Sequence, residues 1–130
     1  MELDEAAVAL ERVAAHHAGL RLLVVHGSRS RHQAHPGSDW DLGYVAADRV
    51  DPAALHADAA RVLGTDDVDV VDLARASALL RFCAAAHGRC VFEAAPGAHE
   101  AFVLAATLFW CDAEAVIRRA QAAVLADLSG

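Results

Sequence analysis

Two aspartates, Asp39 and Asp41, stand two positions apart at the start of an apolar stretch, "DWDLGYVA" (39–46). Residues two apart on a strand share a face, so both carboxylates would lie side by side while Trp40 and Leu42 point into the core. Like charges this close raise a carboxyl pKa unless a cation lies between them. Mg²⁺ binds through one or two carboxylates together with substrate phosphates. The pair therefore predicts a Mg²⁺ site; a solvated turn capped by Asp39 is the structural alternative.

A Gly-Ser turn precedes this pair. Gly27 and Ser28 closely follow the apolar run "LRLLVV" (20–25). Glycine has no Cβ, so backbone N–H groups at such a turn can approach a phosphate closely, and the serine hydroxyl adds a donor. Arg29 could add bidentate bonds to phosphate, or it could be a solvated arginine on a short surface helix. The turn predicts a phosphate-binding element.

A third carboxylate is expected from "DVDVVDL" (67–73). Asp69 lies between two valines and projects from the face opposite to theirs, whereas Asp72 has the opposite parity unless the strand bulges. Asp72 could instead cap the helix that follows. A carboxylate on a neighbouring strand would complete a two-metal site, in which one ion holds a triphosphate and the other activates the attacking hydroxyl. Strand parity favours Asp69, and the choice between the two stays open.

Apolar periodicity indicates the elements that position these residues. Helices are predicted over 3–18, 52–63, 74–87 and 98–127, and strands over 20–25, 39–46, 67–73 and 89–94. Asp51 followed by Pro52 is typical of a helix start, and Gly64 of a helix end. This order predicts an α/β (α+β) fold, a small mixed sheet flanked by helices. A chain of 130 residues suits one domain, covering 1–130.

Composition excludes several classes of protein. A net charge of −7 argues against direct nucleic-acid binding through a basic face. Three cysteines, Cys83, Cys90 and Cys111, with no CxxC argue against a disulfide framework or a zinc knuckle, and predict reduced thiols in a cytoplasmic protein. The acidic N-terminus is unlike a signal peptide, and the longest apolar run, 101–111, is too short to span a membrane.

Histidines near the turn, His26, His32 and His35, raise a zinc site as an alternative. No helical pattern or cysteine supports zinc here. Ordinary loop histidines are the simpler interpretation.

The predicted terminal helix, 98–127, is apolar nearly all round. A small domain cannot bury every face of one helix. We therefore expect one part to pack on the core and another to contact a partner or a second copy, giving a hetero- or homo-oligomer. The alternative is a helix that simply spans the core.

Together, Gly27-Ser28, Asp39-x-Asp41 and the apolar-flanked Asp69 resemble the nucleotidyltransferase superfamily that includes DNA polymerase beta and kanamycin nucleotidyltransferase. The finer pattern, "GSRSRHQAHPGSDWDLGYV", "DVDVVDL" and "ALLRFCAAAHGRCVFE" followed by one terminal helix, resembles the minimal nucleotidyltransferases (MNT). These are the antitoxins of HEPN/MNT toxin–antitoxin pairs. The resemblance covers roughly residues 20–95. The chain departs from it at His32, where glycine is common, and near His35.

The resemblance implies a polymerase beta-like fold and a set of roles. Gly27 and Ser28, with Arg29, would hold the triphosphate of ATP, and Asp39, Asp41 and Asp69 would bind two Mg²⁺ ions. The reaction would transfer AMP from ATP to a hydroxyl, in the antitoxin branch a tyrosine of a cognate HEPN RNase toxin, which is thereby neutralised.

Two other functions remain open from the sequence. One is a binding module that blocks its toxin by forming a complex. The other is transfer to a small hydroxylated molecule such as an aminoglycoside. Enzymes of that second kind usually carry an additional helical domain, for which 130 residues leave no room.

Overall fold

The structure, a computed structural model, describes residues 1–31 and 37–129 and contains one mixed four-stranded sheet. Its strands are β1 (Leu20–His26), β2 (Trp40–Ala46), β3 (Val68–Asp72) and β4 (Arg89–Glu93). Their spatial order is β3-β2-β1-β4, with β2 and β4 antiparallel to β1, and β3 parallel to β2. The apolar run in β1 therefore lies at the centre of the sheet, as a strand buried on both faces requires. The predicted fold class is confirmed.

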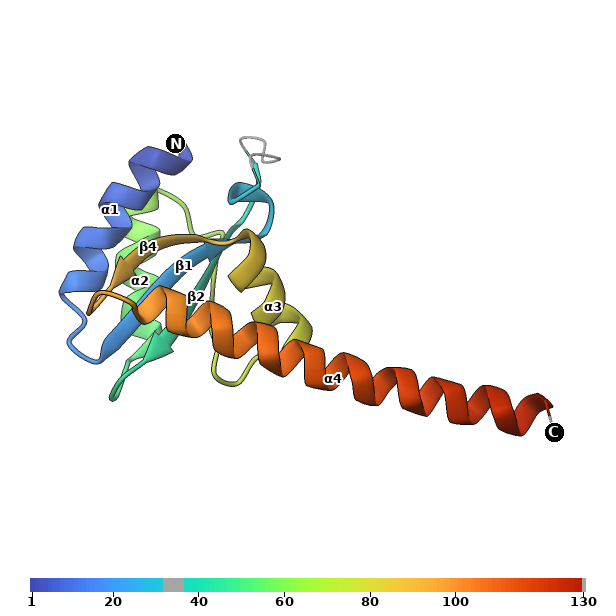
Figure 1. Ribbon diagram of the computed structural model, residues 1–130. Helices are drawn as coiled ribbons and strands as arrows, with labels where there is room; N and C mark the ends of the chain where they lie inside the picture. The colour runs from blue at the N-terminus through green and yellow to red at the C-terminus, as the bar shows by residue number, and fades with distance from the viewer. Residues whose placement is uncertain (32–36, 130) are drawn as a thin grey trace.

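Helices cover both faces of this sheet (Figure 1). They are α1 (Leu3–Ala15), α2 (Pro52–Leu63), α3 (Ala78–His87) and α4 (Ala98–Ser129), with a short 3₁₀ turn, η1 (Gly27–Arg29), after β1. α1 and α2 pack on one face, and α3 and α4 lie on the other (Figure 1). The helix α2 makes the crossover between the parallel strands β2 and β3.

The face towards α1 and α2 carries the main apolar core. Leu23 and Val25 of β1 and Leu42 of β2 are fully buried there against Leu10 and Leu55 of the two helices. Because strand residues alternate between faces, their neighbours along the chain point to α3 and α4.

The opposite face is packed closely through small residues. A Cβ placed on Gly88 would lie 2.4 Å from Cγ1 of Val24, and one placed on Gly43 would lie 2.8 Å from the Leu73 side chain. Ala84 of α3 is fully buried in this layer. Glycine and alanine thus let α3 and the segment after β3 approach the sheet.

Capping residues set the helix ends. Asp51 accepts hydrogen bonds from the backbone N–H groups of Ala53 and Ala54, at 3.0 and 3.2 Å, and Gly64 ends α2 with a left-handed φ of 71°. Both predictions are confirmed. The predicted start of the next helix at residue 74 is wrong: α3 begins at Ala78, because the Ser77 side chain accepts from the Leu80 N–H at 3.1 Å.

Asp72 caps a turn rather than a helix, since its carboxylate accepts from the Ala74 N–H at 3.0 Å. The first helix also ends earlier than predicted, at Ala15 rather than 18, and residues 16–19 form the turn into β1. Such end effects depend on single hydrogen bonds, which periodicity does not detect.

The terminal helix α4 is continuous, and its two halves differ. Its first half packs on α3: Trp110 stacks on Phe82 with ring centroids 5.9 Å apart, and the Arg81 guanidinium lies 4.5 Å from the Phe109 ring centre. Its second half extends away from the sheet (Figure 1). The exposed large apolar residues of α4 as a whole are Leu104, Leu108, Phe109, Val116, Ile117, Val124, Leu125 and Leu128. Across the described residues, no helix, not even α4, combines the length and hydropathy that a membrane crossing requires.

Candidate active site

The turn after β1 is shaped around a carboxylate. Gly27 has a left-handed φ of 72°, which favours glycine, and a Cβ there would lie only 2.2 Å from Oδ2 of Asp41. The hydroxyl of Ser30 donates to the Gly27 carbonyl oxygen at 2.8 Å and closes the turn. Two independent features therefore favour glycine at this position: the backbone conformation and the close approach of Asp41.

Three side chains form a row across the adjacent strands β1, β2 and β3. His26 pairs with Asp41 in the antiparallel β1–β2 ladder, and Asp41 pairs with Asp69 in the parallel β2–β3 ladder. Paired residues on neighbouring strands lie on the same face, here the face that carries α3 and α4. We call His26, Asp41 and Asp69 the carboxylate row.

The register favours Asp69 over Asp72 as the third carboxylate. Asp72 pairs with Tyr44, at the other end of β2 from Asp41, and it is occupied by its own turn. The Asp39 side chain is exposed just before β2, while Trp40 and Leu42 are buried at 2 % and 0 % exposure. The predicted direction of these two apolar side chains is confirmed.

Burial dominates the electrostatics of the row. It raises the pKa of the Asp41 carboxyl; His26 opposes this shift, and the charges of Asp69 and Asp39 add to it. Burial also lowers the pKa of His26, although Asp41 and Asp69 act in the opposite direction. Burial therefore disfavours the charged forms of both His26 and Asp41.

Arg29 connects the turn to the start of β2. Its Nη2 donates to the Ser38 carbonyl oxygen at 2.8 Å, and its guanidinium carbon lies 4.2 Å from the Trp40 ring centroid. These contacts hold η1 against the strand that carries Asp41. The predicted contact of Arg29 with phosphate stays a prediction.

The donors in the row suit a magnesium ion that brings other ligands with it. Residues 1–31 and 37–129 contain no group of three histidine, cysteine, aspartate or glutamate side chains arranged to hold a metal. Asp41 lies over the Gly27 turn, and a cation there would offset the repulsion that raises its pKa. Mg²⁺ commonly binds one or two carboxylates and takes its remaining ligands from phosphate and water. The carboxylates fit that ion, whereas a cage made entirely of protein ligands is absent from the described chain.

His26 is the site residue that sequence reasoning placed wrongly. The sequence favours a loop residue, with a zinc group of His26, His32 and His35 as the alternative, but His26 is the last residue of β1 and is buried. His32 and His35 lie outside the described residues. The signal that could have found it is the alternation of Leu22, Val24 and His26 on one face.

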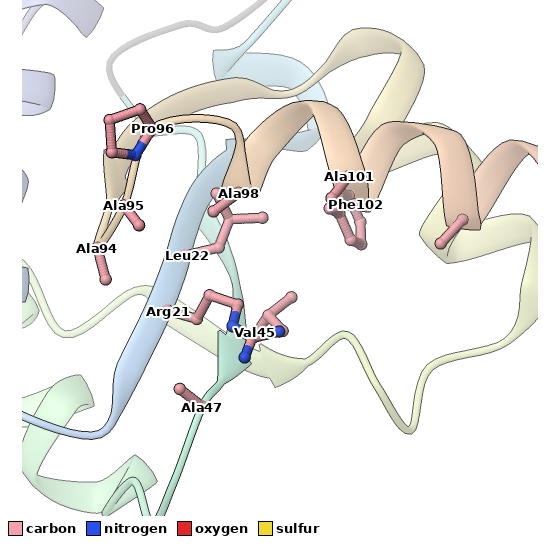
Figure 2. A pocket seen from close by; sticks show the side chains of 11 residues that line it. Arg21, Leu22, Val45, Ala47, Ala94, Ala95, Pro96, Ala98, Ala101 and Phe102 are labelled. Atoms are coloured by element: carbon pink, nitrogen blue, oxygen red, sulfur yellow. The ribbon is translucent and has the colours of Figure 1, made fainter.

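A separate hollow lies at the other end of the same sheet face. This cavity has a volume of about 730 Å³. Its lining includes Leu22 of β1, Val45 of β2 and Phe102 of α4 (Figure 2). Among the described residues that line the cavity, Arg21 is the one with a charged side chain. Lacking carboxylates, it is not a candidate for metal-dependent chemistry.

Comparison with known protein families shows which family the chain belongs to. The sequence profile of the family described as polymerase beta, nucleotidyltransferase matches residues 9–96. This chain belongs to that family. The matched region contains the Gly27 turn and the whole carboxylate row, and the predicted nucleotidyltransferase family is confirmed.

Several solved structures with a similar fold come from toxin–antitoxin systems. One, a crystal structure of a toxin–antitoxin with AMP-PNP, is 25% identical with a TM-score of 0.67 and covers 98% of this chain and 99% of that chain. A mutant of the toxin–antitoxin MntA-HpeT is 26% identical with a TM-score of 0.63 and covers 93% of both chains.

A third similar structure contains a modified toxin. It is a tri-AMPylated Shewanella oneidensis HEPN toxin in complex with MNT antitoxin, 25% identical with a TM-score of 0.56, covering 86% of this chain and 85% of that chain. A sequence comparison with curated proteins finds no significant match. The resemblance to the MNT family that the sequence indicated is confirmed.

Proposed function

We propose that this chain is an antitoxin that neutralises a HEPN-type toxin by transferring AMP from ATP to a tyrosine hydroxyl of that toxin. The observation that carries the proposal is the pairing of Asp41 with Asp69 directly beside the Gly27 turn. The similar structures of a toxin–antitoxin with AMP-PNP and of an AMPylated HEPN toxin support the choice of nucleotide and acceptor.

The Gly27 turn binds the triphosphate. Its left-handed glycine leaves no side chain between the backbone and the bound anion. The Ser28 hydroxyl adds a donor, and Arg29 holds the turn against β2 through Ser38 and Trp40.

Asp39, Asp41 and Asp69 hold Mg²⁺, for which we propose two ions. When bound, the metal neutralises the triphosphate and lowers the pKa of the acceptor hydroxyl. A carboxylate site in a chain of net charge −7 would otherwise repel ATP.

Asp69 accepts the proton of the acceptor hydroxyl. It is the exposed carboxylate of the row, on β3 next to Asp41, so an incoming side chain can reach it. The acceptor oxygen forms a bond to the α-phosphorus as the bond from that phosphorus to the β-phosphate oxygen breaks, and pyrophosphate leaves. Positioning by the turn and the row supplies the in-line geometry.

The second half of α4 binds the toxin. It leaves Val116, Ile117, Val124 and Leu125 between 48% and 64% exposed, on a helix that extends beyond the sheet (Figure 1). Exposed apolar surface of this kind marks interaction sites, so a partner that covers it would stabilise the helix.

Intact-mass spectrometry of the partner toxin tests the proposal. Incubation with this protein, ATP and Mg²⁺ should add the mass of one or more AMP groups to the toxin. Asp41→Asn should slow this addition strongly. Asp66→Asn, an exposed aspartate in the loop before β3, is the matched control and should leave it intact.

A binding-only antitoxin is the second candidate, favoured by the exposed apolar surface of α4. It predicts an unmodified toxin that co-purifies in a tight complex, and an Asp41→Asn variant that still protects cells. That pair of results would contradict AMP transfer as the neutralising step.

A further inference from the structure

His26 is a polar residue in an apolar place. At 8% exposure it is the one buried polar or charged residue in the part of the chain that the structure describes. Its Nε2 is shielded from solvent and has no hydrogen-bond partner among the described residues. Burying an unpaired polar nitrogen destabilises a folded protein, whereas an apolar side chain would not.

Folding alone does not require a histidine here. Leu20 and the run from Leu22 to Val25 make the rest of β1 apolar, apart from the exposed Arg21. A large apolar residue at position 26 would continue the same burial. Core packing therefore does not explain why position 26 is a histidine.

The neighbours of His26 supply that explanation. The ladder places it opposite Asp41, where paired side chains have Cβ atoms roughly 4.5–5.5 Å apart. Oδ2 of Asp41 lies against Gly27, the residue that follows His26 in the chain. The Asp41 carboxylate is thus bordered by the imidazole on one side and by the triphosphate-binding turn on the other.

We propose that His26 is a positioning residue for nucleotidyl transfer: when metal and triphosphate bind, its unpaired Nε2–H donates to the Asp41 carboxylate and holds that carboxylate in the orientation that binds them. The inference rests on the proposed function of the same site. His26 acts through Asp41 and does not itself contact the nucleotide.

The chemistry of a buried imidazole suits this role. The ring is buried beside Asp41, and an imidazole in its neutral form has one N–H to donate. A neutral donor orients the carboxylate without cancelling its negative charge. That charge stays available to the cation, as with other groups that orient metal ligands.

Binding of Mg²⁺ with AMP-PNP, measured by calorimetry, tests the role without requiring turnover. His26→Phe keeps the size and burial of the ring but removes the donor, and we expect affinity to fall about 10-fold or more. His26→Gln places an amide N–H near the position of Nε2, and we expect it to restore most of that loss. Without ligand, the melting temperature of His26→Phe should equal or exceed that of the wild type, because an unpaired buried nitrogen is removed.

A double-mutant cycle distinguishes a role through Asp41 from general packing. In the Asp41→Asn background, His26→Phe should cause no further loss of affinity. An undiminished loss there would overturn the inference, as would wild-type affinity in His26→Phe or failure of His26→Gln to restore binding. If the wild type itself binds no Mg²⁺–AMP-PNP, the proposed function fails as well; if only the His26 variants behave like wild type, this inference alone fails.

Discussion

The two faces of the sheet use the same strands for different purposes. Val25 and Leu42, both fully buried, face α1 and α2, while the residues next to them in sequence, His26 and Asp41, face α3 and α4. Because side chains alternate along a strand, one face can be apolar throughout while the other gives up apolar burial for charged and polar groups. Stability and the proposed chemistry are therefore separated here by one residue along the chain.

The largest expected effect is a loss of activity from a substitution on the face that carries His26 and Asp41. Asp41→Asn should reduce AMP transfer by roughly 10²–10³-fold, because a metal–carboxylate interaction contributes several kcal/mol to the transition state. Its melting temperature should not fall, since burial already disfavours the charged form. Mass spectrometry of the toxin and thermal unfolding measure the two effects. A loss of stability that parallels the loss of transfer would contradict the separation of the faces.

A substitution of Leu42, the next residue along the strand, should have the opposite result: lower stability with little change in AMP transfer. Leu42→Ala removes a fully buried side chain from the α1 and α2 face and should lower the free energy of unfolding by about 2–5 kcal/mol. At a temperature where the variant remains folded, it should retain most AMP transfer. Denaturant titration gives the first quantity. Transfer as poor as that of Asp41→Asn, in a folded sample, would show that the two faces are coupled.

Gly27→Ala should weaken nucleotide binding and also lower the stability of the fold. Its φ of 72° costs a residue with a Cβ about 1–2 kcal/mol, and the new Cβ would displace the Asp41 carboxylate, whose Oδ2 lies 2.2 Å away. We therefore expect weaker binding of Mg²⁺–AMP-PNP together with modest destabilisation. Gly64→Ala is the matched control: it has a φ of 71° but open space around it, so it should destabilise without affecting nucleotide binding.

The smallest effect concerns pH in the absence of metal. Burial raises the pKa of Asp41, so its contribution to stability is fully present below the unfolded pKa of about 3.9 and is lost as pH rises through the folded value. Asp41→Asn removes this dependence. Relative to wild type, its melting temperature should be about 1–2 °C more favourable at pH 7 than at pH 4, since Asp41 keeps part of its hydration.

Leu42→Ala is the control for this pH dependence, because no ionisable group changes. Its deficit in melting temperature should be equal at the two pH values. A pH-independent difference for Asp41→Asn would mean that the carboxyl is not buried enough to be perturbed.

Local patterns predicted most elements and indicated candidate residues for the site. Asp51, Pro52 and Gly64 indicated both ends of α2, and strand parity favoured Asp69 over Asp72 as the third carboxylate, which stays a prediction. These features depend on a few consecutive residues, so the sequence contains the information needed. The start of α3 was missed because Ser77, rather than the apolar periodicity, determines it.

Local sequence patterns could not predict which residues each site residue contacts. The pairing of His26 with Asp41, and the contact of Arg29 with Trp40 and Ser38, depend on how separate segments align in space. A shift of one residue in the β1–β2 register would turn Asp41 to the other face, and no local pattern reports that register.

The sequence by itself determined the residue types, the alternation that separates apolar from polar faces, and the turn that only glycine accommodates. Tertiary structure alone decided that His26, Asp41 and Asp69 form one row and that the second half of α4 extends uncovered from the sheet. The physical reason is range. Helix caps, turns and side-chain alternation are short-range properties of the backbone, whereas register and burial result from packing between segments far apart in the chain.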